Sequence, residues 1–111
     1  MKIYLSPVRS EQEIVAVKLG DSLIINGEQF DFSPMGDGDT LPAEAISSPW
    51  FPGDVEKTEG ELIITLLFPI PQNFSPEQAF PVPLEGLQDG VIEFPAPLPI
   101  TSEQAASEDQ V

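Results

Sequence analysis

The stretch that decides the fold is residues 23–32, Leu-Ile-Ile-Asn-Gly-Glu-Gln-Phe-Asp-Phe. An Asn-Gly pair between two runs of strand-forming residues predicts a two-residue hairpin loop, because both central residues of a type I′ turn take positive φ. With Asn26-Gly27 as the loop, Ile25 lies opposite Glu28. One face of the hairpin then carries Leu23, Ile25, Phe30 and Phe32. The opposite face carries Ser22, Ile24, Gln29 and Asp31. The apolar face needs a cover, which predicts a second layer of structure.

Two further strands are predicted before this hairpin. Residues 2–9 alternate between apolar and polar side chains, and Pro7 marks an edge position or a bend. Residues 13–19 also alternate, and Gly20-Asp21 then turns the chain into the hairpin. Val15, Val17 and Leu19 share one face, and Ile14, Ala16 and Lys18 share the other. Val15 and Val17 are predicted to lie in the core. A helix over residues 10–19 is the alternative, since Ser10 and Glu13 resemble a capping box, but the β-branched residues favour a strand.

A second hairpin is predicted with Glu59-Gly60 as its loop. Val55 then faces Ile64, Glu56 faces Ile63 and Lys57 faces Leu62. Residues 61–68 form the most apolar run of the chain and are predicted to be the central strand. Glu59 at positive φ is a cost, so a longer, bulged loop is the alternative.

The segment between the hairpins is less regular. Residues 33–40 form a loop broken by proline and glycine. Residues 41–51 fit either one helical turn that starts at Pro42 or an extended segment. The extended form is favoured because Pro49 and Pro52 flank Trp50, and it carries Ile46 and Trp50 into the core.

From Pro69 onward the composition changes, and eight of the 13 prolines lie there. The pattern Phe-Pro-x-Pro occurs at Phe68, Phe80 and Phe94. Proline lacks the N–H that a sheet needs and stiffens the chain, which predicts an extended arm over residues 69–100. We expect each of these phenylalanines to anchor the arm on its own sheet; the alternative is an arm that wraps a neighbouring subunit or a partner.

Three details complete this expectation for the second half of the chain. Residues 75–79 are expected to make one helical turn, and residues 91–94 to add a strand. Residues 101–111 are polar and acidic without periodicity, and are expected to be a disordered tail.

The predicted fold class is therefore all-β. We expect a small antiparallel meander of about five to seven strands that forms a sandwich or half-barrel over residues 1–68, with a proline-rich extended C-terminal half. The arm belongs to the same domain. The predicted core comprises Ile3, Leu5, Val15, Val17, Leu23, Ile25, Phe30, Phe32, Trp50, Val55, Leu62, Ile64, Leu66 and Phe68.

The charge is strongly negative. The chain holds 19 acidic and 4 basic residues, giving a net charge of −15. Nucleic acids and anionic membranes carry the same sign, so binding to either is disfavoured. Three interpretations of this charge are open: it keeps the protein soluble, it forms an acidic surface that docks on a basic partner, or it imitates DNA and so blocks a DNA-binding protein. The carboxylates are scattered among turns, whereas a DNA mimic needs them in regular rows. We expect neither a signal peptide nor a transmembrane helix.

The residue inventory leaves little room for catalysis. The chain has no histidine and no cysteine, which removes the common nucleophile systems and zinc sites. Nucleotide-binding glycine motifs are absent from the sequence as well. Asp37-Gly38-Asp39 has the spacing of calcium ligands, but the twelfth loop position is Ser48 instead of glutamate, so a solvated turn is favoured. We therefore predict no enzyme, and no catalytic, cofactor-binding or metal-binding residues.

Five stretches carry a resemblance to a known group: residues 1–7 (Met-Lys-Ile-Tyr-Leu-Ser-Pro), residues 23–34, Trp50, residues 53–56 (Gly-Asp-Val-Glu) and residues 60–62 (Gly-Glu-Leu). They resemble small acidic, uncharacterised proteins encoded in the tail-gene region of tailed bacteriophages and prophages. The resemblance covers about the first 70 residues, and it rests on turn and core residues, so it implies kinship without assigning a site.

The expected function is accordingly that of a non-enzymatic phage or prophage protein that binds another protein, in tail assembly or in association with the virion. The alternative is an acidic inhibitor that blocks a basic host nucleic-acid-binding protein. The expected partner is a phage tail or host protein, or a second copy of the chain, with no nucleic acid, membrane or cofactor involved. The expected location is the cytoplasm of the bacterial host or the virion.

Overall fold

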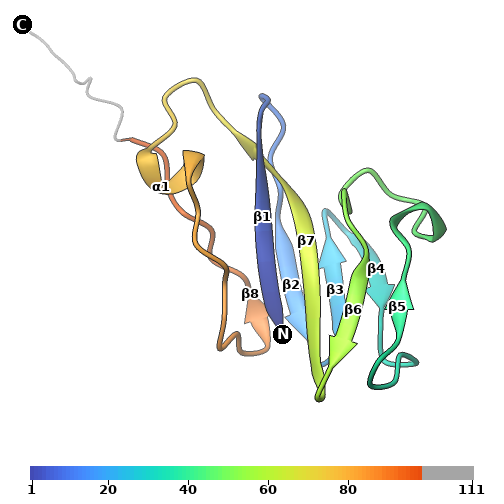
Figure 1. Ribbon diagram of the computed structural model, residues 1–111. Helices are drawn as coiled ribbons and strands as arrows, with labels where there is room; N and C mark the ends of the chain where they lie inside the picture. Colours follow the sequence, from blue (N-terminus) through green and yellow to red (C-terminus); the bar gives the residue numbers. More distant parts are fainter. Residues whose placement is uncertain (99–111) are drawn as a thin grey trace, which may run out of the picture.

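The described part of the chain forms two four-stranded sheets packed face to face (Figure 1). The computed structural model describes residues 1–98. The first sheet, sheet A, has the order β1 (Lys2–Arg9), β7 (Glu61–Ile70), β6 (Val55–Thr58), β5 (Thr40–Leu41). The second, sheet B, has the order β4 (Glu28–Asp31), β3 (Ser22–Ile25), β2 (Ala16–Leu19), β8 (Gly90–Val91). The predicted all-β fold is confirmed.

The helical content of the described residues is two short turns. A 3-10 turn covers Ala43–Ala45, so the helical alternative is adopted there, and α1 covers Pro76–Ala79. Within residues 1–98, no helix is long and apolar enough to cross a membrane. The disordered tail predicted for residues 101–111 lies outside the described residues.

The central hairpin forms as predicted. Asn26 and Gly27 take φ values of 49° and 88°, and Ile25 pairs with Glu28. The Asn26 side chain also reaches the chain before β2: its Oδ1 accepts from the backbone N–H of Val15 at 2.8 Å, and its Nδ2 donates to the carbonyl of Glu13 at 3.1 Å. The loop therefore sets both the register of its own hairpin and the start of β2.

The second hairpin also has its predicted two-residue loop. Glu59 and Gly60 take φ values of 51° and 82°, and the pairs Glu56–Ile63 and Lys57–Leu62 form. The bulged alternative is not adopted. Strand β7 lies inside sheet A, between β1 and β6, as expected for the most apolar run of the chain.

The pairing of β1 with β7 is parallel, which corrects the expectation of a purely antiparallel meander. Lys2 lies beside Ile63, and the register continues to Arg9 beside Ile70. Strand β6 pairs only with the first three residues of β7, so most of β7 depends on β1 for its backbone hydrogen bonds. Pro7 lies on the outer strand of the sheet, so of the two expectations for it, an edge position or a bend, the edge position is confirmed.

Strand β2 has its faces reversed relative to the prediction. The strand predicted over residues 13–19 is confirmed for Ala16–Leu19. Ala16 lies beside Ile25 and is fully buried, however, whereas Val15 and Leu19 are 56% and 48% exposed. Val17 is half-buried on the same outer face as these two. Val15 and Val17 were thus wrongly placed in the core. The cause is the pairing with β3: a residue directly opposite Ile25 must share its inward face.

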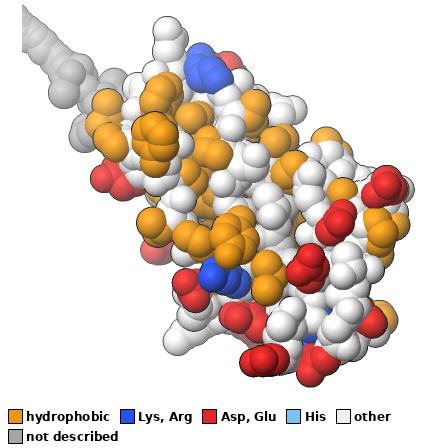
Figure 2. All heavy atoms as spheres, in the orientation of Figure 1, with side chains coloured by type: hydrophobic (Ala, Val, Ile, Leu, Met, Phe, Trp, Pro, Cys, Tyr) orange, Lys and Arg blue, Asp and Glu red, His pale blue; other side chains and the backbone are white. Residues whose placement is uncertain are grey.

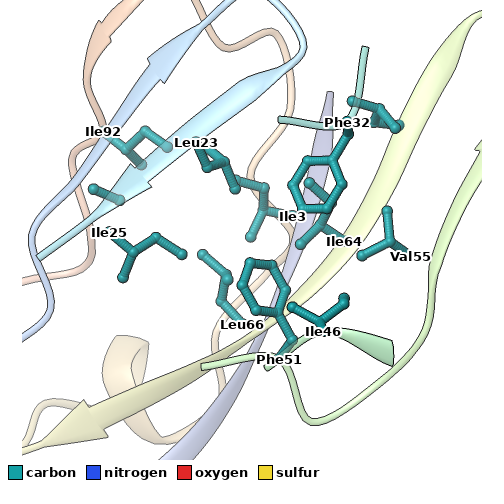
Figure 3. Packing of buried hydrophobic residues seen from close by; sticks show 12 residues of the cluster. Ile3, Leu23, Ile25, Phe32, Ile46, Phe51, Val55, Ile64, Leu66 and Ile92 are labelled. Carbon is teal, nitrogen blue, oxygen red and sulfur yellow. The ribbon is translucent and has the colours of Figure 1, made fainter. Parts of the chain in front are cut away.

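The core lies between the sheets. Figure 3 shows Leu23 and Ile25 of sheet B pointing toward Ile3, Ile64 and Leu66 of sheet A. Of the other predicted core residues, Phe32, Val55, Leu62 and Phe68 are buried, and Leu5, Phe30 and Trp50 are partly buried against the core. The prediction omitted Ala16, Phe51 and Ile92, and Ile46 is buried as expected. The Phe51 ring forms T-shaped pairs with the rings of Phe30 and Phe32, at centroid distances of 4.9 and 5.8 Å.

Candidate functional site

The aspartates of the calcium-like sequence stabilise turns. Asp37 Oδ1 accepts from the backbone N–H of Gly60 at 2.8 Å, and Asp39 Oδ2 accepts from the N–H of Gly36 at 2.8 Å. Each carboxylate therefore has one oxygen committed to the backbone of a tight turn. In the part of the chain that the structure describes, no three acidic side chains gather in a way that would hold a metal ion.

The three Phe-Pro-x-Pro segments have different environments. Phe68 is buried, and the ring of Phe94 stacks on it at a centroid distance of 5.5 Å. Phe80, in contrast, is 84% exposed, and Val82 beside it is 76% exposed. The expectation that every one of these phenylalanines anchors the arm on its own sheet is wrong for Phe80. The segment Phe80–Pro83 is thus the one of the three whose phenylalanine is left in water.

The chain before this segment is held firmly by α1. The helix starts with a capping box, in which the Ser75 side chain accepts from the backbone of Gln78 and the Gln78 side chain accepts from the backbone of Ser75. The same two side chains tie α1 to the later part of the chain: Ser75 Oγ donates to the carbonyl of Ala96 at 2.7 Å, and Gln78 Nε2 donates to that of Pro95 at 3.2 Å. The helix ends where the Phe80 N–H donates to the Pro76 carbonyl.

The chain after the segment is held by the edge of sheet A. The N–H of Ile3 donates to the carbonyl of Leu84 at 2.9 Å, and the N–H of Leu84 donates to the carbonyl of Ile3 at 2.8 Å. Phe80–Pro83 is therefore fixed at both ends, and its prolines restrict the chain between them. The backbone that carries the exposed ring is therefore restrained before anything binds to it.

A hollow of about 430 Å3 opens beside Phe80. It is lined by Glu77, Phe80, Val82, Pro95 and Ala96. Figure 2 shows hydrophobic side chains gathered over the end of the molecule that carries α1, whereas many acidic side chains lie toward the opposite end, around β5 and the β6–β7 loop. The surface is apolar, shallow and bordered by one carboxylate.

A second hollow of about 430 Å3 lies between residues 10–14 and the C-terminal segment. The stacked rings of Phe68 and Phe94 line it, together with the carboxylates of Glu11 and Glu13. With no histidine or cysteine anywhere in the sequence, its titratable groups are these carboxylates alone. Binding through aromatic and acidic groups is the chemistry that such a lining offers.

The four cations are each engaged with a neighbouring group. Lys18 Nζ lies 3.0 Å from Asp89 Oδ1, Lys57 Nζ lies 3.5 Å from Asp21 Oδ2, and Arg9 lies 2.7 Å from Glu11. The ammonium of Lys2 lies 5.3 Å from the centre of the Tyr4 ring. Most carboxylates therefore have no cationic neighbour among the described residues, and the field around the protein is negative.

Comparison with known proteins finds no relative: neither the protein-family models, nor the curated proteins, nor the solved structures contain a match to this chain. The site must be interpreted from its own geometry. Sequence reasoning identified Phe80-Pro81-Val82-Pro83 as one of three equivalent patterns, but the pattern held no signal that distinguishes the exposed copy from the buried ones.

Proposed function

We propose that this chain is a non-enzymatic protein that binds another protein through the segment Phe80–Pro83, in tail assembly or on the virion of a phage or prophage. The observation that carries the binding proposal is the 84% exposure of Phe80 on a segment fixed at both ends. The phage role is supported by the resemblance of residues 1–7 and 23–34 described above.

Two physical arguments support binding at this segment. Aromatic side chains bury a large area, about 150–250 Å2 each, so they dominate the energetics of many interfaces. Because α1 and the Ile3–Leu84 bridge hold the segment in place, little chain entropy is lost when a partner covers it. A partner that fits has an apolar pocket for the Phe80 ring, flanked by a surface that accepts the neighbouring prolines.

The experiment is affinity capture with the whole tagged chain, from bacterial cells in which the phage or prophage genes are expressed. Wild type is compared with Phe80→Ser, and Val82→Ser is compared with Val8→Ser. The last two make the same chemical change at exposed sites, 76% and 39%, and Val8 lies on β1, outside the segment. We expect wild type and Val8→Ser to recover tail proteins, and Phe80→Ser and Val82→Ser to lose them.

Two outcomes would contradict the proposal. If Phe80→Ser recovers the same tail proteins as wild type, the segment is not the binding site. If all variants recover a basic nucleic-acid-binding host protein that moderate salt releases, the acidic inhibitor is the better description. A thermal melt serves as the control for folding, because loss of an exposed side chain changes stability by only about 0.5 kcal/mol.

A further inference from the structure

The outer face of sheet B carries a row of aliphatic side chains. Val17 on β2 lies directly beside Ile24 on β3 and directly beside Val91 on β8. Val15 and Leu19 flank Val17 on the same face, since side chains alternate along the strand. Val91 is 71% exposed, and Val15 and Leu19 are about half exposed. The row is therefore continuous across three neighbouring strands and open to water.

The outer face of sheet A has a different composition. There Ile63 lies between Lys2 and Glu56, and Tyr4 lies beside Thr65. This mixture of polar and apolar side chains is usual for a sheet face in contact with water. The outer face of sheet B, in contrast, is mostly aliphatic, as a buried face would be. For this reason the sequence pattern alone predicts that Val15 and Val17 lie in the core.

The charged groups around the row are carboxylates. Asp31 on β4 shares the outer face, because its partner Ser22 lies two residues from Ile24, and Glu93 follows β8 on the same side as Val91. The Asp31 carboxylate accepts from the N–H of Ser33 at 3.0 Å and from the hydroxyl of Ser22 at 3.1 Å, which lowers its pKa. It therefore stays ionised at neutral pH.

Among the described residues, no lysine or arginine lies on this face to balance the charge of these carboxylates. Lys18 on β2 lies on the opposite side of the strand, beside Leu23, and its ammonium is paired with Asp89. Lys2, Arg9 and Lys57 all belong to sheet A. An apolar centre with an acidic rim is complementary to an apolar centre with a basic rim.

We infer that the outer face of sheet B is a docking surface for a protein partner whose own contact surface places lysine or arginine side chains around apolar ones. This surface is separate from the Phe80–Pro83 segment, so the inference does not depend on the function proposed above. A second copy of the chain is a poor occupant, because it would bring its own Asp31 and Glu93 against the same acidic rim on a chain of net charge −15.

The test uses the whole chain and a short fluorescent peptide in which leucine and lysine alternate. Fluorescence anisotropy measures its binding to wild type, Val17→Ser and Val91→Ser. Val82→Ser is the matched control, and it is also the variant that tests the proposed function. We expect Val17→Ser and Val91→Ser each to weaken binding about tenfold, the effect of losing one well-buried aliphatic contact, while Val82→Ser binds as wild type does.

Two further peptides separate the contribution of charge to binding from that of apolar contact. A peptide of alternating serine and lysine tests charge alone, and one of alternating leucine and glutamate tests apolar contact alone; we expect both to bind at least about tenfold more weakly. Amide NMR shifts caused by the leucine–lysine peptide should centre on Val17, Ile24 and Val91.

Three results would overturn the inference. Equal binding by the serine–lysine peptide would show attraction by net charge only. Shifts centred on the β6–β7 loop would place the site on sheet A instead of on the outer face of sheet B. A dimer in sedimentation experiments that Val91→Ser dissociates would assign the face to a second copy.

Discussion

Replacement of Glu59 by asparagine should stabilise the protein. The two hairpin loops have nearly the same backbone: φ is 49° and 88° at Asn26-Gly27, and 51° and 82° at Glu59-Gly60. Glutamate at positive φ is strained, because a Cβ in the left-handed region costs about 1–2 kcal/mol. Asparagine occupies this region several-fold more often than most residues, which corresponds to about 0.5–1 kcal/mol. We expect Glu59→Asn to recover that amount.

The measurement is equilibrium unfolding in urea, followed by the fluorescence of Trp50, the single tryptophan, which packs against the core. In a separate thermal melt, a gain of this size should raise the melting temperature by about 2–5 °C. Glu59→Gln is the matched control, because it removes the same negative charge from a highly acidic chain and leaves a side chain that disfavours positive φ. The reasoning is refuted if the Asn and Gln variants unfold at the same urea concentration.

Two other predictions test the strand faces and the pH dependence. Ala16→Asp buries an unpaired carboxylate in the core and should lower the free energy of unfolding by at least about 3 kcal/mol, whereas Val15→Asp on the outer face should change it by less than about 1 kcal/mol. Melts followed by circular dichroism measure the stability of both variants. If Val15→Asp is the more destabilising of the two, the face assignment made from the sequence is right. The lowered pKa of Asp31, caused mainly by hydrogen bonds from Ser33 and then from Ser22, adds stability that is present above the ordinary value of 3.8 and is lost as the pH falls through the folded-state pKa. Wild type should therefore lose stability more steeply than Asp31→Asn as acid is added below about pH 4.5, and parallel unfolding curves for the two proteins would contradict this.

Both hairpins were predictable because their information is local. A two-residue loop with positive φ needs particular residues, and it fixes which side chains lie opposite one another. The same rule would have corrected the faces of β2. With Gly20-Asp21 as a two-residue turn, Leu19 pairs with Ser22, and Lys18 is then opposite Leu23 on the core side. An alternating strand can turn either of its two faces toward the core, and only its pairing with the next strand decides which. The more hydrophobic face of β2 was therefore the wrong one to place inward.

The pairing of β1 with β7 was beyond local reasoning. Most of the sequence of the domain lies between these two strands, and no tight turn joins them. Which strand fills the open edge of β7 depends on where every intervening segment goes. The different environments of the Phe-Pro-x-Pro segments have the same origin. The ring of Phe94 stacks on that of Phe68, whereas Phe80 follows the end of α1, where no ring among the described residues packs against it. The four residues of the Phe-Pro-x-Pro pattern do not determine which side chains the rest of the fold packs against them.

The acidic charge and the exposed apolar surfaces are linked physically. A protein that keeps Phe80, Val82 and Val91 in water would tend to associate with itself through them. A net charge of −15 opposes that association by long-range repulsion, and it does so for copies of the chain and for other acidic proteins alike. The repulsion becomes attraction only toward a basic surface. Under the two proposals above, solubility and partner choice are thus two consequences of the same charge, because the repulsion keeps the apolar surfaces free for a protein of opposite charge.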